Sequence, residues 1–315
     1  MSVVHIIAGL VLLVIGGELL VRSSVGLSFK LKLSKLVIGM TVVSFATSAP
    51  ELFVSVGAAW NGHTDLALGN VIGSNIANIA LVLGLTALIS PLFVDKEFFL
   101  VNWPMMLFTS ILLYLFLQND LVLSRIEGGI LLALLIAFVV LLISRARKLR
   151  ISAPEDIDES LKQTSNSKIF IWFVLGMFAL YLGSDWLIKG ASEIALKLGV
   201  TEAVIAATMV AFGTSVPELA ASVIAALKQE KALSLGNLIG SNIFNIGSVL
   251  GITALIQPVK LNSIALLNND MFWMIAVAFI ILPMAFLPTQ NKLSRLEGLT
   301  LLIGYMTFIY LKFAS

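Results

Sequence analysis

The second half of this chain repeats the first, at a spacing of 167 residues over most of the repeat and of 170 residues near its end. Residues 69–91 read GNVIGSNIANIALVLGLTALISP and residues 236–258 read GNLIGSNIFNIGSVLGITALIQP, which match at 17 of 23 positions. Farther along, the sequence Leu-Ser-Arg-Ile-Glu-Gly at 123–128 returns as Leu-Ser-Arg-Leu-Glu-Gly at 293–298. A repeat that extends over the whole chain indicates that each half is one structural unit and that the two units build the fold together.

The composition predicts that these units fold in a lipid bilayer. Of the 315 residues, 59% are hydrophobic and only 12% are charged, with a mean hydropathy of +1.02. Soluble domains carry about 25% charged residues, so this chain cannot cover its surface with charge. The net charge of +2 gives no reason to expect nucleic-acid binding, and the lack of cysteine excludes disulfides and thiolate metal sites. The first apolar stretch carries Glu18 and Arg22, which favours a retained span over a signal peptide.

Ten apolar segments have the length of about 20 residues that a membrane span requires. We therefore expect an all-α membrane protein of ten transmembrane helices, built as two five-helix repeats over residues 1–145 and 169–315. The polar residues 146–168 are expected to form a solvated cytoplasmic linker between the repeats. The ten segments lie near residues 3–25, 35–59, 67–90, 98–118, 125–145, 169–191, 200–227, 233–256, 268–287 and 294–312.

The number of spans and the positions of the basic residues together predict the orientation. Five spans per repeat is an odd number, so the second repeat must lie inverted relative to the first. With ten spans, 15 of the 20 Lys and Arg residues fall on one side of the membrane. The positive-inside rule makes this side cytoplasmic, so both termini lie outside. We expect a multi-pass protein of the cell (inner) membrane that functions as a monomer.

Each half also carries one acidic residue within an apolar run. Glu51 ends the sequence Ser-Phe-Ala-Thr-Ser-Ala-Pro-Glu, and Glu218 ends Ala-Phe-Gly-Thr-Ser-Val-Pro-Glu at the repeat spacing. A carboxylate at bilayer depth costs roughly 2.5 kcal/mol or more, and neither span has a basic residue placed to neutralise it. The two copies predict that Glu51 and Glu218 face each other and hold a cation at mid-membrane height.

Polar residues lie on both sides of each glutamate at helical spacing, and the Gly-Asn segments carry further polar residues at the same spacing. Positions three and four apart share a helix face, so four helices each present one polar stripe. Pro50 and Pro217 have no N–H, so the carbonyls of Ala46 and Gly213 lose their helical hydrogen bonds. Unpaired carbonyls at this depth are tolerated where they line a cavity or bind a ligand. Carboxylates, hydroxyls, amides and carbonyls are the ligands of hard cations. The stripes are Ser44, Thr47, Ser48, Glu51 and Ser55; Thr214, Ser215, Glu218 and Ser222; Asn70, Ser74 and Asn78; and Asn237, Ser241 and Asn245.

The motif Thr-Ser-x-Pro-Glu followed by Gly-Asn-x-Ile-Gly-Ser-Asn-Ile-x-Asn, present in both halves, resembles that of the sodium/calcium exchanger family in its compact prokaryotic form. The resemblance covers nearly the whole chain. It implies an antiporter that exchanges Na+ for Ca2+ by alternating access, with the first and sixth spans sliding across the bundle. It implies no enzyme activity and no cofactor besides the transported ions.

The resemblance also implies which residues bind the ions. Glu51, Glu218 and the carbonyls of Thr47 and Thr214 would hold Ca2+. Flanking sodium sites would pair the hydroxyls of Thr47 with Ser74 and of Thr214 with Ser241. The predicted ligands are completed by the carbonyls of Ser44 and Ala211, by Ser48 and Ser215 from the polar stripes, and by Asn78 and Asn245 at a middle position.

Two departures and three alternatives bear on this assignment. Some relatives carry aspartate at the position of Asn245, and potassium-dependent relatives carry an acid there, so this chain resembles the potassium-independent type. Ala46 stands where glycine is usual. A cation/proton exchanger with H+ or K+ coupling is the main alternative, although proton-coupled relatives carry an acid soon after the Gly-Asn of these motifs. A passive cation channel and an intramembrane protease with an acidic dyad are the others.

Four further polar residues admit two interpretations each. Glu18 and Asp185 are followed four residues later by Arg22 and Lys189, a spacing that favours ion pairs near the interface over an ion gate. Asn75 and Asn242 either satisfy backbone groups at a helix break or take part in the site.

Overall fold

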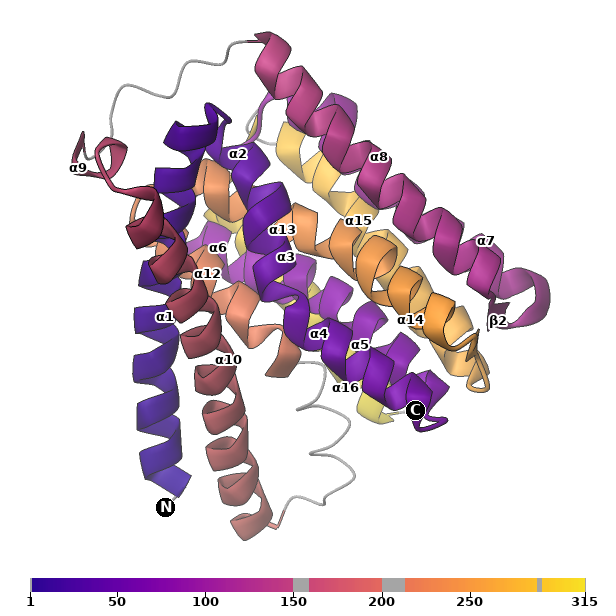
Figure 1. Cartoon of the computed structure of the whole chain (residues 1–315). Helices are drawn as coiled ribbons and strands as arrows, with labels where there is room; N and C mark the ends of the chain where they lie inside the picture. Colours follow the sequence, from indigo (N-terminus) through magenta and orange to yellow (C-terminus); the bar gives the residue numbers. More distant parts are fainter. Residues whose placement is uncertain (1, 150–158, 200–212, 288–290, 315) are drawn as a thin grey trace.

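The computed structural model of the chain describes residues 2–149, 159–199, 213–287 and 291–314 (Figure 1). Within these residues, seven helical stretches are long and apolar enough to cross a membrane, and a bent pair of helices forms an eighth when counted as one span. The expected span 200–227 lies partly outside the described residues, and its described part includes a helix over Val216–Leu227. The expected span 294–312 coincides with a helix over Arg295–Ala314. The all-helical membrane fold is confirmed, and the count of ten spans stays a prediction.

The first half forms its helices where the apolar segments predict them. Several short stretches are π-helical and are labelled η. The elements are α1 (Ser2–Leu31), α2 (Lys35–Ile38), η1 (Gly39–Val43), α3 (Ser44–Thr47), α4 (Ala49–Trp60), α5 (Thr64–Ile76), η2 (Ala77–Leu83), α6 (Gly84–Ile89), β1 (Leu92–Phe93), η3 (Phe98–Asn102), α7 (Trp103–Asp120), β2 (Val122–Leu123) and α8 (Arg125–Leu149).

The linker contains a short helix, and the second half follows the same order as the first. Because α8 ends at Leu149 and α10 begins at Asn166, both helices extend a few residues into the predicted linker. The elements are α9 (Glu159–Lys162), α10 (Asn166–Lys197), α12 (Val216–Leu227), α13 (Lys231–Phe244), η4 (Asn245–Leu250), α14 (Gly251–Ile256), β3 (Val259–Lys260), η5 (Leu266–Asp270), α15 (Met271–Phe286), β4 (Lys292–Leu293) and α16 (Arg295–Ala314).

Polar caps fix where several helices begin. At the start of α8, the Glu127 carboxylate accepts hydrogen bonds from the Ser124 amide and hydroxyl, both at 2.8 Å. Glu297 accepts the same two bonds from Ser294 at the start of α16. This Ser-x-x-Glu pairing is a capping box, which satisfies backbone donors that the first helical turn leaves open. The repeated Leu-Ser-Arg-x-Glu-Gly sequence therefore sets the start of the last helix in each half.

Two short strand pairs join the halves. β1 pairs antiparallel with β4, with Leu92 opposite Leu293, and β2 pairs with β3, with Leu123 opposite Val259. In the repeat, β1 corresponds to β3 and β2 to β4, so the two pairings are equivalent contacts. The sequence pattern predicts none of these strands, because two residues are too few to show alternation.

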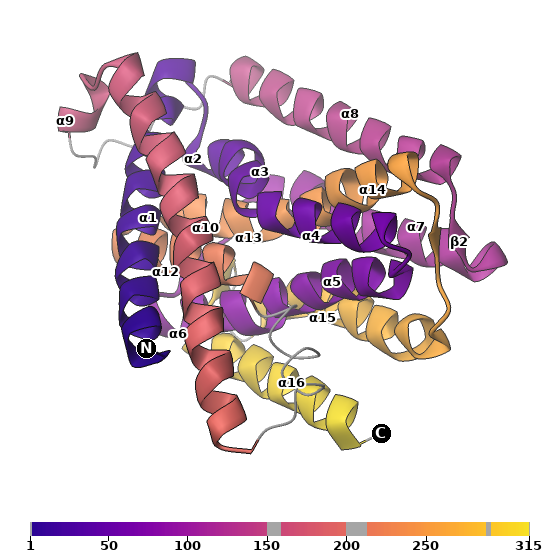
Figure 2. The ribbon, with the colours of Figure 1, turned by 60° about the horizontal axis from the view of Figure 1, so that its bottom comes forward.

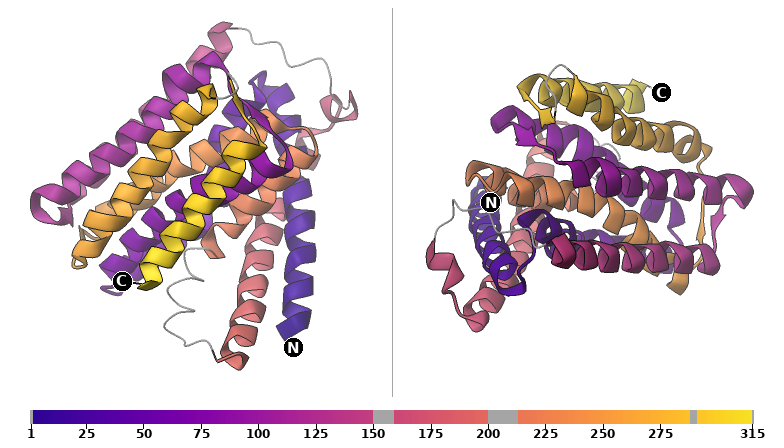
Figure 3. Two further views of the ribbon diagram at one scale, coloured as in Figure 1. Left: turned by 180° about the vertical axis from the view of Figure 1, so that it is seen from behind. Right: turned by 90° about the horizontal axis from the view of Figure 1, so that it is seen from above.

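Glycine pairs bring helices of opposite halves into backbone contact. A Cβ on Gly84 of α6 would lie 3.0 Å from the carbonyl oxygen of Gly298 on α16. The equivalent contact joins Gly251 of α14 with Gly128 of α8, again at 3.0 Å. Figure 3 (left) shows α16 on the back of the molecule, where it covers α6 and η2. Small residues allow this close approach between membrane helices.

The core consists of the two runs that carry the Gly-Asn motifs. In the apolar windows of the runs Thr64–Ile89 and Lys231–Ile256, 72% and 83% of the residues are buried, against 22–39% in the other five spans. The outer helices expose large apolar side chains such as Val14, Ile136 and Phe170, as expected of a surface whose solvent is lipid. The polar stripes predicted from the sequence therefore lie where water and lipid are excluded.

The two longest helices, α1 and α10, pack side by side and antiparallel at one edge of the bundle (Figures 1 and 2). Their contact runs along glycines of both helices. A Cβ on Gly183 would lie 2.9 Å from the carbonyl oxygen of Gly9, and one on Gly176 would lie 2.9 Å from the amide nitrogen of Leu20. Any larger side chain at these positions would push the two helices apart.

Candidate functional site

The first acidic motif lies at a break between two helices. α3 ends at Thr47, α4 begins at Ala49, and the two spans of the pair meet at a bend of 43°. Ser48 lies at the break with φ −84° and ψ 3°. Pro50 in the first turn of α4 causes the break, because it has no N–H and its ring disfavours a preceding helical turn. The break places Glu51 in the first turn of α4.

The second motif has the same local structure. α12 begins at Val216, Pro217 lies in its first turn, and Ser215 has φ −85° and ψ −1°. The Gly213 carbonyl, which Pro217 was expected to leave without a helical partner, accepts a hydrogen bond of 2.6 Å from the Ser184 hydroxyl of α10. Ser184 thus ties α10 to the second motif. The sequence gives no signal for this role, because the equivalent position in the first half is Gly17.

Glu51 and Glu218 are both fully buried, at 0% exposure. Glu218 lies within electrostatic range of Glu51, and the Ser74 and Thr214 hydroxyls also lie near Glu51. The Ser48 hydroxyl donates to Glu218 Oε1 at 3.4 Å, which links the two motifs directly. In the part of the chain that the structure describes, no salt bridge reaches either carboxylate. The prediction that these two glutamates come together is consistent with these contacts.

The threonines of the motifs contact asparagine and serine of the opposite half. Thr47 Oγ1 donates to Asn237 Oδ1 at 3.2 Å and lies 3.3 Å from Ser241 Oγ. In the equivalent contacts, Thr214 Oγ1 donates to Asn70 Oδ1 at 3.1 Å and lies 3.1 Å from Ser74 Oγ. The four polar stripes therefore pack against one another in the interior of the protein.

The hydroxyl contacts join Thr47 to Ser241 and Thr214 to Ser74. The sodium-ligand pairs that the family resemblance implies, Thr47 with Ser74 and Thr214 with Ser241, stay a prediction. The observed contacts arise because η1 and α3 pack directly on α13 of the other half. Gly39 makes this possible, since a Cβ there would lie 2.4 Å from the Leu233 carbonyl oxygen.

The amides of the two asparagine rows hold the ends of the stripes. Asn70 Nδ2 donates to Ser55 Oγ at 3.0 Å, and Asn237 Nδ2 donates to Ser222 Oγ at 3.0 Å. Because each of these asparagines also accepts from a threonine of the other half, its amide links a serine of its own half to that threonine. Ser55 and Ser222 are thereby explained as structural partners.

Asn78 and Asn245 lie in the π-helical stretches η2 and η4, and both are 0% exposed. A π-helical turn inside an α-helix re-aims side chains and is frequent at functional sites. Both amide atoms of Asn78 and the Oδ1 of Asn245 are buried without a hydrogen-bond partner in the described structure. Asn245 Nδ2 donates to Asn75 Oδ1 at 3.1 Å.

The remaining predicted ligands have these positions. The Ser44 carbonyl accepts from the Ser48 amide at 2.9 Å, and its hydroxyl donates to the carbonyls of Gly39 and Asn237. Ser48 and Ser215 are buried at the two breaks. Ala211 lies outside the described residues, so the prediction for its carbonyl stays a prediction.

The ion pairs predicted for Glu18 and Asp185 are present, and their position near the membrane interface stays a prediction. Arg22 Nε lies 2.5 Å from Glu18 Oε1, and Lys189 Nζ lies 2.7 Å from Asp185 Oδ2. Lys228, directly after α12, also reaches Glu18, at 2.7 Å.

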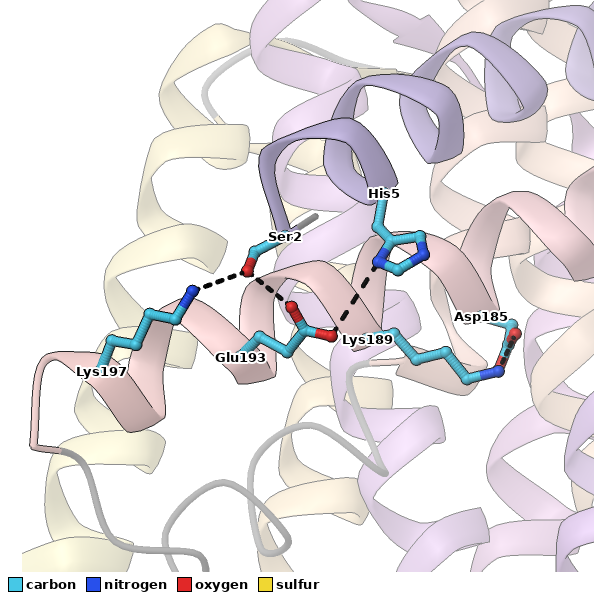
Figure 4. A network of polar contacts seen from close by, with 6 residues as sticks. All are labelled: Ser2, His5, Asp185, Lys189, Glu193 and Lys197. Atoms are coloured by element: carbon cyan, nitrogen blue, oxygen red, sulfur yellow. Dashed lines mark hydrogen bonds and ion pairs between the residues drawn. The ribbon is translucent and has the colours of Figure 1, made fainter.

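Beyond Asp185, polar contacts continue along α10 to the start of α1 (Figure 4). Ser2 Oγ donates to Glu193 Oε2 at 2.6 Å and accepts from Lys197 Nζ at 3.3 Å. His5 Nδ1 lies 4.0 Å from Glu193 Oε1. These contacts join the ends of the two helices outside the buried site.

A cavity of about 510 Å³ lies between α4 and α10. Asp185 and Ser184 line it on one side, Pro50 on another, and Thr214 is also in its wall. A neighbouring cavity of about 640 Å³ between α10 and the breaks is lined mainly by apolar residues, among them Phe53 and Met177. The first cavity therefore extends from a charged side chain to a residue of the buried cluster.

Apolar outer helices around a buried cluster of carboxylate, hydroxyl and amide groups define a multi-pass membrane protein with a polar site in its interior. The family model described as "Sodium/calcium exchanger protein" matches residues 1–144 and 168–314. This chain belongs to the sodium/calcium exchanger protein family, and its membership assigns it to cation/calcium exchange.

Individual relatives match over the full length. CaxA of Alkalimonas amylolytica is 38% identical over 323 residues, covering 100% of this chain and 99% of that protein. The sodium/calcium exchanger MaX1 of Methanosarcina acetivorans is 32% identical, covering 98% of this chain and 97% of MaX1. A structure of the sodium-calcium exchanger NCX_Mj soaked with Na+ and Ca2+ superposes with a TM-score of 0.83 at 31% identity, covering 98% of this chain and 97% of that one. The chain is similar to known exchangers from end to end.

Proposed function

We propose that this chain exchanges Na+ for Ca2+ by alternating access, with the ions bound between Glu51 and Glu218. The observation that carries the proposal is a concentration of unpartnered polar atoms. Among the described residues, twelve buried side-chain nitrogen or oxygen atoms have no hydrogen-bond partner, and six of them belong to Glu51, Glu218, Asn78 and Asn245. Each such atom costs about 1–3 kcal/mol, and a hard cation coordinated by the five oxygens among these six atoms would offset the cost of those oxygens.

The donor set suits Ca2+. Calcium takes six to eight oxygen ligands in flexible geometry. The two carboxylates supply up to four oxygens, and we assign the carbonyls of Thr47 and Thr214 to the same ion. The described residues contain no group of three or more His, Cys, Asp or Glu side chains that could hold a metal. Two acids among neutral oxygens match the charge of one divalent ion or of two monovalent ions.

The same cluster provides neutral oxygens for Na+. We place the flanking sodium positions at the hydroxyl pairs that the packing brings together, Thr47 with Ser241 and Thr214 with Ser74. The carbonyls of Ser44 and Ala211 and the hydroxyls of Ser48 and Ser215 remain the further ligands of this assignment, and Asn78 and Asn245 form the middle position. Because the carboxylates are shared, Na+ and Ca2+ compete for the site, as exchange requires.

Access to the site would alternate through movement of α1 and α10 relative to the rest. The glycine-lined contact makes these two helices one body, and the cavity between Asp185 and Thr214 supplies a route from one side. In this proposal the chain has ten spans in two inverted repeats, residues 1–145 and 169–315, joined by the linker 146–168. Both termini lie outside, in the cell (inner) membrane, and one copy suffices for transport.

The orientation has a direct test, because the chain contains no cysteine. A single cysteine at Asn61, in the loop between α4 and α5, should react with a membrane-impermeant maleimide added to intact cells. One at Lys30, near the end of α1, should react only after the cells are opened. The opposite pattern would refute the proposed orientation.

The exchange reaction is tested by 45Ca2+ uptake into proteoliposomes loaded with Na+. Uptake should require an outward Na+ gradient and should stop in Glu51→Gln and Glu218→Gln, whereas Glu193→Gln, a control on the exposed side of α10, should keep it. Uptake driven by a pH gradient without Na+ would indicate a cation/proton exchanger instead. Uptake without any counter-ion would indicate a channel.

A further inference from the structure

A chain of amide hydrogen bonds connects the two halves beside the middle position. Asn75 of α5 donates through Nδ2 to the Asn242 carbonyl at 3.2 Å, with Met274 Sδ of α15 at 3.7 Å. The Oδ1 of Asn75 accepts from Asn245 Nδ2 at 3.1 Å. Asn75 is 1% exposed and Asn245 is 0% exposed, so water does not compete with these bonds.

The direction of this chain determines which end of the Asn245 amide stays available. An asparagine amide has an oxygen end that accepts and a nitrogen end that donates, with nearly the same shape. Because Asn75 Nδ2 is used on a carbonyl, only its oxygen faces Asn245, which must therefore present its nitrogen. The Oδ1 of Asn245 is left buried and without a partner. Oxygen is the end that a hard cation binds, and a donor N–H₂ in its place would repel the cation.

We propose that Asn75 is a positioning residue that holds the Asn245 amide with its oxygen available to the transported ion. The inference rests on the proposed function and adds a residue outside the predicted ligand set. Asn75 binds no ion itself. It acts by fixing the orientation of a neighbour from the other half of the chain.

The counterpart residues of the repeat do not make the equivalent hydrogen bond. The counterpart of Asn75 is Asn242, whose Nδ2 donates to the Leu238 carbonyl of its own helix at 2.8 Å. The counterpart of Asn245 is Asn78, whose amide atoms have no hydrogen-bond partner in the described structure. One amide of the middle position is therefore held in a fixed orientation by a neighbour and the other is not, although both halves have the same Gly-Ser-Asn-Ile-x-Asn sequence.

A merely structural role for Asn75 predicts different behaviour when Asn245 is changed. If Asn75 only stabilises the contact with the Asn242 carbonyl, its loss should do the same harm whatever residue stands at 245. If Asn75 sets the amide orientation, it should become dispensable in Asn245→Asp, since a carboxylate has two equivalent oxygens and no wrong end.

The experiment compares Asn75→Leu, which keeps the side-chain shape, in the wild-type and Asn245→Asp backgrounds, with Asn242→Leu as the matched control. The KM for Ca2+ in Na+-driven uptake should rise about three- to tenfold in Asn75→Leu, the range expected for one hydrogen bond, with Vmax retained. Asn242→Leu should change the KM less than about twofold, and so should Asn75→Leu in the Asn245→Asp background. Equal effects in both backgrounds, or an equal effect of Asn242→Leu, would overturn the proposal.

A second variant decides the matter if Asn75→Leu does not fold. Asn75→Asp keeps the oxygen that accepts from Asn245 and loses the group that donates to the Asn242 carbonyl. Its KM for Ca2+ should stay at or below the wild-type value, whereas a structural role predicts harm at least equal to that of Leu. Direct Ca2+ titration of the purified proteins by calorimetry repeats the comparison without Na+. A wild type that binds Ca2+ but shows no Na+-driven uptake would refute the coupling and leave the role of Asn75 testable.

Discussion

Replacing either buried glutamate by glutamine should separate function from stability. A doubly charged Ca2+ ion about 2.4 Å from a carboxylate oxygen gains roughly 14 kcal/mol from that charge at an effective dielectric constant of about 20. The cost of keeping the carboxylate out of water cancels several kcal/mol of this. A loss of about 3 kcal/mol or more remains, which is a factor of at least about 10² in affinity. The expected result for Glu51→Gln and for Glu218→Gln is loss of measurable Ca2+ uptake.

The same substitution should not destabilise the protein without its ions. Both carboxyl groups are fully buried, and neither oxygen of Glu51 has a hydrogen-bond partner in the described structure. A neutral side chain of the same shape avoids the cost of burying an acid without a partner, so the melting temperature in chelator should equal or exceed the wild-type value. It is followed by the fluorescence of the five tryptophans.

Added Ca2+ completes this test. A ligand at about 100 times its Kd stabilises the native state by about 2.7 kcal/mol. Wild type should therefore melt at a higher temperature with Ca2+, and neither glutamine variant should. The reasoning is refuted if a variant retains uptake, or if it melts well below wild type in chelator, as loss of a structural partner would require.

Three further substitutions have expected outcomes. Ser184→Ala leaves the buried Gly213 carbonyl without its 2.6 Å hydrogen bond and should cost about 1–3 kcal/mol, seen as a lower melting temperature than that of Ser192→Ala on the same helix. Gly183→Leu should separate α1 from α10 and reduce the monodisperse fraction in size-exclusion chromatography, whereas Gly304→Leu, with nothing within 4 Å of its Cβ, should not. Asn245→Asp should keep uptake but make it fall more steeply as the pH is lowered, because a third buried carboxylate must lose its proton to bind a cation; an unchanged pH profile would contradict this.

Much of the site follows from the sequence because helical spacing determines which side chains share a face. The polar stripe from Ser44 to Ser55 that includes Glu51, and the stripe from Asn70 to Asn78, were predictable from positions three and four apart. Pro50 likewise predicted a break, since proline removes a backbone donor wherever it stands. These are local properties, and the structure reproduces them in both halves.

The features that the sequence did not predict depend on which helix faces which. Helical spacing orients Thr47 on its own helix but does not say whether Ser74 or Ser241 lies opposite, and the structure places Ser241 there. The different partners of Asn75 and Asn242 could not be predicted at all, because both occupy the same sequence, Gly-Ser-Asn-Ile. Their difference arises from neighbours such as Met274, which are far away in the chain.

The crossed contacts have a consequence for how the two halves can work. Among the described residues, the hydrogen bonds of the Thr47 hydroxyl outside its own helix go to the second half, and the Ser48 hydroxyl contacts Glu218. The strand pairs β1–β4 and β2–β3 and the glycine contacts of α6 with α16 also join opposite halves. Neither half alone contains a complete set of neighbours for its own glutamate. A change in the relative position of the two halves would therefore alter both hydroxyl pairs at once.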